Sequence, residues 1–308
     1  WYQHGLNTIP FFIYYSMFGM QRVGDLIWAA ADSRCRGFLL GATAGRTTLN
    51  GEGLQHQDGH SPLLASAIPN LLVYDPAWGY EVTAIIHDGL RRMYQEREPL
   101  FYYLTLYNEN YPMPDMPADD GVLEGILRGM YRFKSVEANQ PKDGLRVQLL
   151  GSGSILREVL RAQTILAERY GVSSDVWSVT SWKSLRVDAE MAERWNVLHP
   201  GEDPKSCHLW DSLKGVEGPF VAATDYVRAV PGMIERWIPG TYAICGTDGF
   251  GRSDTRATLR RFFENDAESI VIATLDALAR DGRFPRERLR DVFGELGFDP
   301  NKPDPITQ

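Results

Sequence analysis

The chain has 308 residues, 44% of them hydrophobic, and carries 32 Lys and Arg against 40 Asp and Glu, which gives a formal net charge of −8. This negative balance argues against electrostatic binding to nucleic acid or to an anionic membrane surface, so the expected partner is a small molecule or another protein. The length and the apolar content suffice for two domains with sizeable cores.

The sequence also argues against membrane insertion and against a disulfide framework. Its longest apolar runs are shorter than the ~20 residues that cross a bilayer. The three cysteines, Cys35, Cys207 and Cys245, lie far apart and in no metal-binding spacing. We therefore expect a reduced, cytoplasmic protein. Because dense aromatic sequence starts directly at Trp1, where no Met stands, we also expect the chain to begin inside a domain.

Strands and helices are predicted to alternate in the first third of the chain. Short apolar runs at 36–43, 70–76 and 100–107 predict buried strands. Between them, 61–68 and 79–95 predict helices, the second because its apolar residues recur at helical spacing. Strands that alternate with helices are typical of a parallel sheet covered by helices.

A proline-rich segment separates this region from the rest of the chain. Residues 108–120 contain three prolines and four acidic residues with little apolar content, which predicts a linker. We place the domain boundary inside this segment. Residues 1–118 then belong to one α/β domain and end in the linker, and residues 119–308 form a second α/β domain.

The second domain is predicted to repeat the alternation. Its expected elements are a helix at 121–133, a strand at 145–154, a helix at 155–171 that ends at Gly171, strands at 174–182, 218–225 and 241–251, and helices at 254–266 and 268–282. No internal repeat or low-complexity tract interrupts them. The pattern again indicates an α/β fold.

Two glycine-rich segments of the second domain match nucleotide-binding motifs only in part. Residues 151–156 follow a predicted strand but carry Leu156 where the dinucleotide fingerprint has its last glycine. Residues 246–254 lack the Lys-Ser/Thr pair that ends a phosphate-binding loop. We interpret both segments as tight turns after strands, and we expect Asp254 to cap the helix that follows.

Five segments, taken in chain order, carry a resemblance to a known family. They are YYSMFGMQRVGD (14–25), GRTTLNGEGLQHQDGHS (45–61), NENYPMP (108–114), LLGSGSILR (149–157) and GTDGFGRSD (246–254). With them, essentially the whole chain resembles the C-terminal part of the homodimeric bacterial pyruvate dehydrogenase E1 component, a thiamine diphosphate enzyme of the transketolase superfamily. The resemblance implies the fold class: the C-terminal half of a transketolase-like pyrimidine-binding domain, with a parallel sheet and helices on both faces, followed by a transketolase C-terminal-like α/β domain.

The resemblance also implies a cofactor, a metal ion and partners. In this family an N-terminal domain, absent from this chain, anchors most of the thiamine diphosphate and the Mg²⁺, and the active site forms between the two subunits of a homodimer. The family's Gly-Asp-Gly…Asn signature does not occur in the sequence, and the glutamate that activates the pyrimidine ring would precede Trp1. We therefore expect no metal ligand in this chain and no activity from this chain alone.

Two aromatic residues are implied to face the cofactor. Phe18 resembles the family's pyrimidine-stacking aromatic residue, and Tyr15 resembles the tyrosine that reaches toward the substrate-derived adduct. A flat heteroaromatic ring favours an aromatic wall, because ring stacking is worth about 0.5–1.5 kcal/mol beyond burial. The alternative is that so many aromatic side chains simply fill a core or a subunit interface.

The polar loop GEGLQHQDGHS (51–61) is implied to face the substrate. His56 takes the place of the family's substrate-side histidine, and an imidazole suits proton transfer near neutral pH. Glu52, four residues earlier, matches the family's accompanying acid and is expected to orient the imidazole. The three glycines of the loop would let the backbone pass close to cofactor and substrate. For His60 and Asp58, a catalytic role and a role in shaping the loop both remain open.

The predicted function follows from these implied roles. The parent enzyme would decarboxylate pyruvate oxidatively and pass the acetyl unit to the lipoyl group of the E2 acyltransferase of its complex. Within the same fold, transketolase or a different 2-oxo acid dehydrogenase is an alternative. The sequence of the 51–61 loop favours the pyruvate type over transketolase. An alternative of another class is a non-catalytic fragment that serves dimerisation or assembly.

Overall fold

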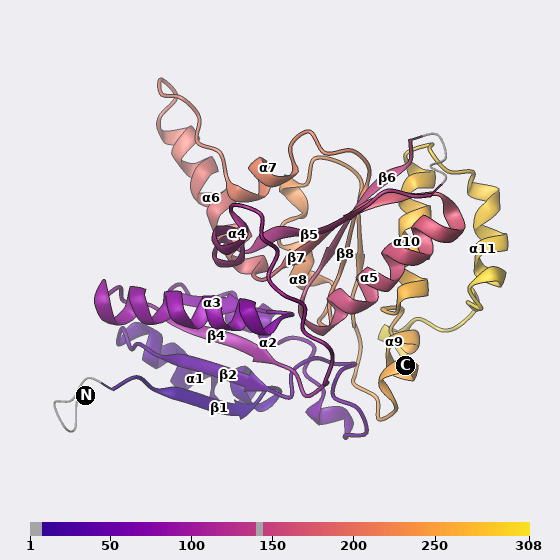
Figure 1. The fold of residues 1–308 in the computed structure, drawn as a ribbon. Helices are drawn as coiled ribbons and strands as arrows, with labels where there is room; N and C mark the ends of the chain where they lie inside the picture. The colour runs from indigo at the N-terminus through magenta and orange to yellow at the C-terminus, as the bar shows by residue number, and fades with distance from the viewer. Residues whose placement is uncertain (1–7, 140–143) are drawn as a thin grey trace.

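The computed structural model describes residues 8–139 and 144–308, which contain two β-sheets (Figure 1). Residues 1–7, where we expect the chain to begin inside a domain, lie outside the described residues. The first sheet has the strand order β1-β2-β4-β3, and all neighbouring strands run parallel. Its strands are β1 (Phe11–Tyr15), β2 (Phe38–Ala42), β3 (Leu71–Tyr74) and β4 (Phe101–Leu106).

Helices cover both faces of the first sheet. They are α1 (Phe18–Asp32), α2 (Ser61–Ala65) and α3 (Gly79–Leu90), which continues as a π-helical turn (Arg91–Gln95). Helix α3 packs against Phe38 and Tyr102, since a Cβ atom at Gly89 would meet both rings. Helix α1 packs on the opposite face, since a Cβ atom at Gly19 would meet the ring of Tyr14, and side chains alternate between faces along a strand.

The parallel sheet, its three predicted strands and the two predicted helices between them are confirmed. The sequence pattern does not reveal β1 or α1. The run of apolar residues from Ile9 to Tyr15 shows neither strand alternation nor helical spacing, and Gly19 and Gly24 lie inside α1. Both elements matter for function, because the implied cofactor-facing residues lie where β1 ends and α1 begins.

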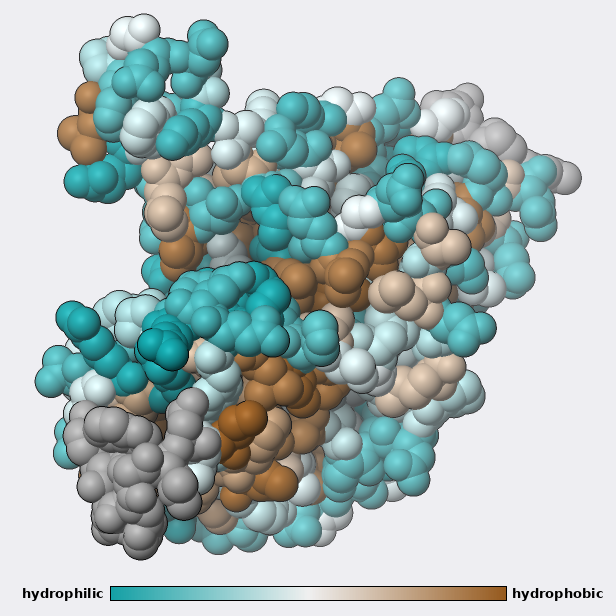
Figure 2. Space-filling model, turned by 60° about the vertical axis from the view of Figure 1, so that its left-hand side comes forward, coloured by the Kyte–Doolittle hydropathy of each residue, from teal (hydrophilic) through white to brown (hydrophobic). Residues whose placement is uncertain are grey.

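Strand β1 lies at the edge of the first sheet and presents an apolar surface. Phe11, Phe12 and Ile13 are 46%, 54% and 64% exposed, and on α1 the side chains of Leu26 and Trp28 are 68% and 50% exposed. Figure 2 shows apolar surface over the part of the molecule that carries this sheet edge. Exposed apolar side chains on an edge strand are typical of a surface that another segment or subunit covers.

The second sheet has the order β5-β7-β6-β8-β9, with β5 antiparallel to β7 and the other neighbours parallel. Its strands are β5 (Met130–Val136), β6 (Arg146–Gly151), β7 (Ser173–Val179), β8 (Phe220–Ala223) and β9 (Tyr242–Cys245). The helices around it are α4 (Val122–Arg128), α5 (Leu156–Ile165), α6 (Trp182–Leu198), α7 (His208–Leu213), α8 (Ala229–Gly232), α9 (Arg256–Phe262), α10 (Ala267–Arg280) and α11 (Leu289–Glu295). None of the helices in the described part of the chain combines the length and the apolar content that crossing a bilayer requires.

Two expectations for the second domain are wrong. The predicted helix at 121–133 already ends at Arg128, because Gly129 adopts a φ of 115° and the chain continues as β5. Asp254 does not cap α9, because the N-cap is Thr255, whose hydroxyl accepts a hydrogen bond from the backbone N–H of Thr258. The other predicted strands and helices of this domain are confirmed.

The linker between the sheets is held in place, although residues 107–118 form no helix or strand. The hydroxyl of Tyr107 donates a hydrogen bond to the buried carboxyl of Asp75, and the hydroxyl of Tyr111 donates one to the carbonyl of Ala77 at 2.7 Å. Both contacts tie the linker to the carboxyl end of β3. The predicted domain boundary at 118 lies in this segment and remains a prediction.

Candidate functional site

Three of the predicted site residues form one cluster at the carboxyl edge of the first sheet. Tyr15 is the last residue of β1, Phe18 is the first residue of α1, and His56 ends a 3-10 turn (Leu54–His56). The ring centroids of Tyr15 and Phe18 are 5.4 Å apart, and that of His56 lies 5.2 Å from Tyr15 and 5.3 Å from Phe18. All three side chains are half-buried. Because α/β sheets bind ligands at the carboxyl ends of their strands, the cluster occupies a position suited to binding.

The fourth predicted residue, Glu52, lies beside this cluster. Its Oε2 atom is 3.5 Å from Nδ1 of His56, which is buried and makes no hydrogen bond within the described part of the chain. Burial, followed by the negative charge of Glu52, raises the pKa of the Tyr15 hydroxyl above its ordinary value. The structure therefore brings all four residues together.

Asp58, whose role the sequence left open, shapes the turn that carries His56. Its buried carboxylate accepts hydrogen bonds from the Ser16 hydroxyl at 2.5 Å and from the backbone N–H groups of His60 and Ser61 at 3.1 and 2.9 Å. The second and third of these bonds hold the start of α2. His60 itself points away toward α1, where its Nε2 lies 2.8 Å from Oε1 of Gln21, and burial lowers its pKa. Both residues thus have structural partners.

The three glycines of the 51–61 loop have different structural reasons. A Cβ atom at Gly59 would collide with the guanidinium of buried Arg46, so this glycine permits a close approach to protein. Gly51 adopts a φ of 72°, which favours glycine, and has open space around it. At Gly53 a Cβ atom would come within 3.6 Å of Nδ1 of His56. Only Gly59 is therefore needed for close packing against this chain.

The second domain contributes a residue that the sequence reasoning missed. Asp225 follows β8 and is fully buried. Its carboxylate accepts hydrogen bonds from the backbone N–H and the hydroxyl of Thr47, at 2.9 and 2.6 Å, and from the same groups of Thr48, at 3.0 and 2.6 Å. These bonds fix the polar segment that leads into the 51–61 loop. An acid placed directly after a buried strand is the one local signal that could have found it.

The cluster fits a flat heteroaromatic ring. One face of the Phe18 ring already takes a planar group, because the guanidinium of exposed Arg22 lies 3.9 Å from the ring centroid. The imidazole of His56 and the carboxylate of Glu52, whose Oε2 lies 3.5 Å from Nδ1 of His56, add polar atoms beside this ring. Among the described residues, no group of three or more His, Cys, Asp or Glu side chains is placed to hold a metal ion. The chain therefore offers a ring-binding wall, and the expectation that other protein anchors a diphosphate and Mg²⁺ stays a prediction.

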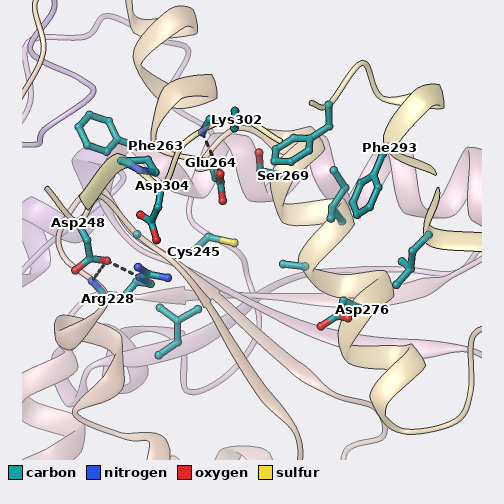
Figure 3. A pocket seen from close by; sticks show the side chains of 17 residues that line it. Arg228, Cys245, Asp248, Phe263, Glu264, Ser269, Asp276, Phe293, Lys302 and Asp304 are labelled. Carbon is teal, nitrogen blue, oxygen red and sulfur yellow. Dashed lines mark hydrogen bonds and ion pairs between the residues drawn. The ribbon is translucent and has the colours of Figure 1, made fainter. Parts of the chain in front are cut away.

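A cavity of about 410 Å³ lies elsewhere, at the carboxyl end of β9 (Figure 3). Both of its basic side chains are paired with acids of its own lining: Nε of Arg228 lies 2.5 Å from Asp248, and Nζ of Lys302 lies 3.0 Å from Glu264. None of the predicted site residues lines it. We therefore locate the candidate site at the aromatic cluster and not in this cavity.

Comparison with protein families divides the chain into two matched regions. Residues 1–114 match the pyruvate dehydrogenase E1 component middle domain, and residues 129–266 match the transketolase-like TK C-terminal domain.

Comparison with individual proteins agrees with these matches. The chain is 54% identical over 306 residues to the pyruvate dehydrogenase E1 component of Cupriavidus necator, which covers 99% of this chain and 34% of that protein. It is 50% identical over 304 residues to the protein of the same name from Escherichia coli, covering 98% of this chain and 33% of that protein. A transketolase from Leishmania mexicana has a similar fold, with a TM-score of 0.66 at 20% identity, over 90% of this chain and 35% of that chain. The chain thus spans about a third of the length of these proteins.

Proposed function

Because the chain belongs to the family of the pyruvate dehydrogenase E1 component, of whose members it spans about a third, we propose that it is part of an enzyme that decarboxylates pyruvate oxidatively with thiamine diphosphate. The acetyl group passes to the lipoyl group of an E2 acyltransferase. Identity of about half to these E1 components, against a fifth to a transketolase, favours the pyruvate reaction over the transketolase reaction. The cluster of Tyr15, Phe18, His56 and Glu52 is the observation that carries the proposal.

We assign the two aromatic residues of the cluster to binding the cofactor ring and to keeping water out of the site. Phe18 would stack against the aminopyrimidine ring of bound thiamine diphosphate; its ring already has the guanidinium of Arg22 over one face, 3.9 Å from the ring centroid. Tyr15 would line the substrate side, where its hydroxyl can donate a hydrogen bond; burial and the nearby Glu52 raise the pKa of this hydroxyl. Together the two rings exclude water from one wall of the site. Bound thiamine diphosphate supplies the carbon nucleophile and the electron sink.

His56 handles protons at the substrate. Its Nδ1 faces Glu52, so the other ring nitrogen, Nε2, is left to donate a proton to the substrate side or accept one from it. Glu52 orients the ring and favours the tautomer that carries the proton on Nδ1. The carboxylate is 44% exposed, so the pair gains more from orientation than from charge attraction.

The remainder of the site comes from protein outside this chain. Mg²⁺ and the diphosphate are anchored there, and a homodimer closes the site between subunits. The apolar edge formed by β1 and α1 offers a surface for such contact. We expect a cytoplasmic enzyme, and we expect no turnover from this chain by itself.

Pyruvate-dependent acetylation of a lipoyl domain by the complete encoded protein tests the proposal. His56→Ala should lower kcat by about 10²–10⁴-fold, the range for loss of a general acid or base, and should leave thiamine diphosphate binding nearly unchanged. The control is His87→Ala, which removes an exposed histidine of α3. Unchanged turnover in His56→Ala would reject the role of His56. Absence of any turnover in the unmodified complete protein would instead favour a non-catalytic assembly role.

A further inference from the structure

The glycine-rich loop 246–254 of the second domain passes directly against the turn that carries His56. At Gly251, a Cβ atom would lie 2.6 Å from the carbonyl oxygen of Leu54 and 2.8 Å from Oε1 of Gln57. Cβ atoms do not approach a backbone oxygen this closely, so a side chain at position 251 would have to displace the turn. The absence of a side chain at position 251 therefore allows the 3-10 turn that ends at His56 to pack directly against the second domain.

Gln57, the neighbour of His56, links the turn to this loop. Its side chain is fully buried. Its Nε2 donates a hydrogen bond to the carbonyl of Leu49 at 2.6 Å, and its Oε1 accepts one from the backbone N–H of Arg252 at 2.6 Å. One amide thus joins the start of the 51–61 loop, its 3-10 turn and the second domain. A buried amide with both ends satisfied is strongly oriented, since leaving either end unpaired would cost about 1–3 kcal/mol.

The loop 246–254 is itself held by further hydrogen bonds. Asp248 accepts hydrogen bonds from Nε and the backbone N–H of Arg228 at 2.5 and 3.3 Å, which Figure 3 shows on the wall of the cavity. The guanidinium of Arg46 donates to the carbonyl oxygens of Thr247, at 3.0 Å, and of Gly249. Because the loop is fixed in this way, it can hold the 3-10 turn that packs against it in one position.

From this geometry we infer that the loop 246–254 is a positioning brace for His56, which acts through Gly251 and Gln57. The inference rests on the proposed function and adds that the second domain takes part in it. Neither residue belongs to the aromatic cluster, and Gln57 is fully buried. Both keep Nε2 of His56 at its working distance, and a displacement of about 1 Å can cost on the order of 10²-fold in rate.

Gly251→Ala in the complete encoded protein tests the brace. We expect kcat for lipoyl acetylation to fall by about ten- to a hundredfold, with thiamine diphosphate affinity nearly unchanged. A cooperative melting transition, at a moderately lower temperature because the added methyl group overpacks the site, shows that the variant is folded. The matched control is Gly294→Ala, since a Cβ atom there meets nothing within 4 Å and the residue lies in the same domain. Gln57→Leu, which removes both amide bonds, is the second variant and should lower kcat to a similar extent.

A double-mutant cycle separates positioning from general loss of structure. If the brace acts only through His56, Gly251→Ala added to His56→Ala should slow turnover little further, because coupled residues are not additive. Equal fractional losses in both backgrounds would overturn the inference, as would full activity of both Gly251→Ala and Gln57→Leu. If His56→Ala leaves turnover intact, the proposed function of His56 fails. If His56→Ala lowers turnover but Gly251→Ala and Gln57→Leu do not, the role of His56 stands and only the brace fails.

Discussion

Asp75 is a buried carboxyl group at the junction of the two sheets. It lies after β3, is fully buried, and accepts hydrogen bonds from the hydroxyls of Thr105, at 2.6 Å, and Tyr107. Burial raises the pKa of its carboxyl to about 6, although both hydroxyls favour the charged form. Its backbone joins the two sheets, because its N–H donates to the carbonyl of Thr180 and its carbonyl accepts from the N–H of Gly153.

This raised pKa predicts a pH dependence of stability. The folded state holds the Asp75 proton more tightly than the unfolded state, so the free energy of unfolding should decrease as the pH rises from about 4 to about 6. In Asp75→Asn this contribution is absent. The stability of the unmodified protein relative to the variant should therefore fall by roughly 2 kcal/mol across that window, measured by urea denaturation. Asp115→Asn, at an exposed site, is the control. A difference that stays flat with pH would contradict the assignment.

At the residue scale, the sequence identified His56, Glu52, Tyr15 and Phe18 because they stand in local segments that resemble a family. The structure brings these four side chains together. The partners that hold their loop could not be predicted in this way. Asp225 binds residues about 180 positions earlier in the chain, and no local pattern encodes so distant a contact.

The linker after β4 is held by contacts that its sequence does not predict. Its prolines predict an irregular segment, and the structure agrees, but Glu109 within it is anchored to the second domain. Its carboxylate lies 2.5 Å from Nη2 of Arg260 and 2.7 Å from Nη1 of Arg157, and Arg260 also pairs with Glu158 at 3.2 Å. Burial alone would raise the pKa of Glu109, yet its bonds to these two arginines bring it below its usual value.

Removing this charge should loosen the junction between the sheets. Glu109→Gln leaves Arg260, whose side chain is 6% exposed, with Glu158 as its remaining ion-pair partner among the described residues. We expect the free energy of unfolding to drop by about 3 kcal/mol, as is usual when one partner of a buried pair is lost. Chemical denaturation of the complete protein measures it, with Glu202→Gln at an exposed position as the reference. A loss no larger than in the reference would show that the pair is not a stabilising contact.

Elements with a regular period were predictable, and those without one were not. Strands β2, β3 and β4 are short apolar runs between turns, and α5 has amphipathic spacing, so their patterns sufficed. Strand β5 was hidden because it follows α4 directly, and only the left-handed conformation of Gly129 separates the two. Tertiary pairing with β7, and not local sequence, decides that this segment is a strand.

At the scale of the whole molecule, the two domains build one site-bearing unit. The first domain supplies the aromatic cluster. The second domain forms hydrogen bonds to the segment that carries His56, through Asp225 and the loop 246–254. Figure 1 shows the linker and the carboxyl edge of the first sheet meeting the second domain. The apolar side chains of β1 and α1 are exposed, and we expect the rest of the subunit or a second subunit to cover them.

The most direct test of the central claim is a structure of the complete encoded protein with thiamine diphosphate and Mg²⁺ bound. We predict that the aminopyrimidine ring lies on the face of Phe18, that Nε2 of His56 points toward the reactive carbon, and that the edge of β1 is covered. A structure with the cofactor bound away from this cluster, and with His56 directed into open solvent, would contradict the claim.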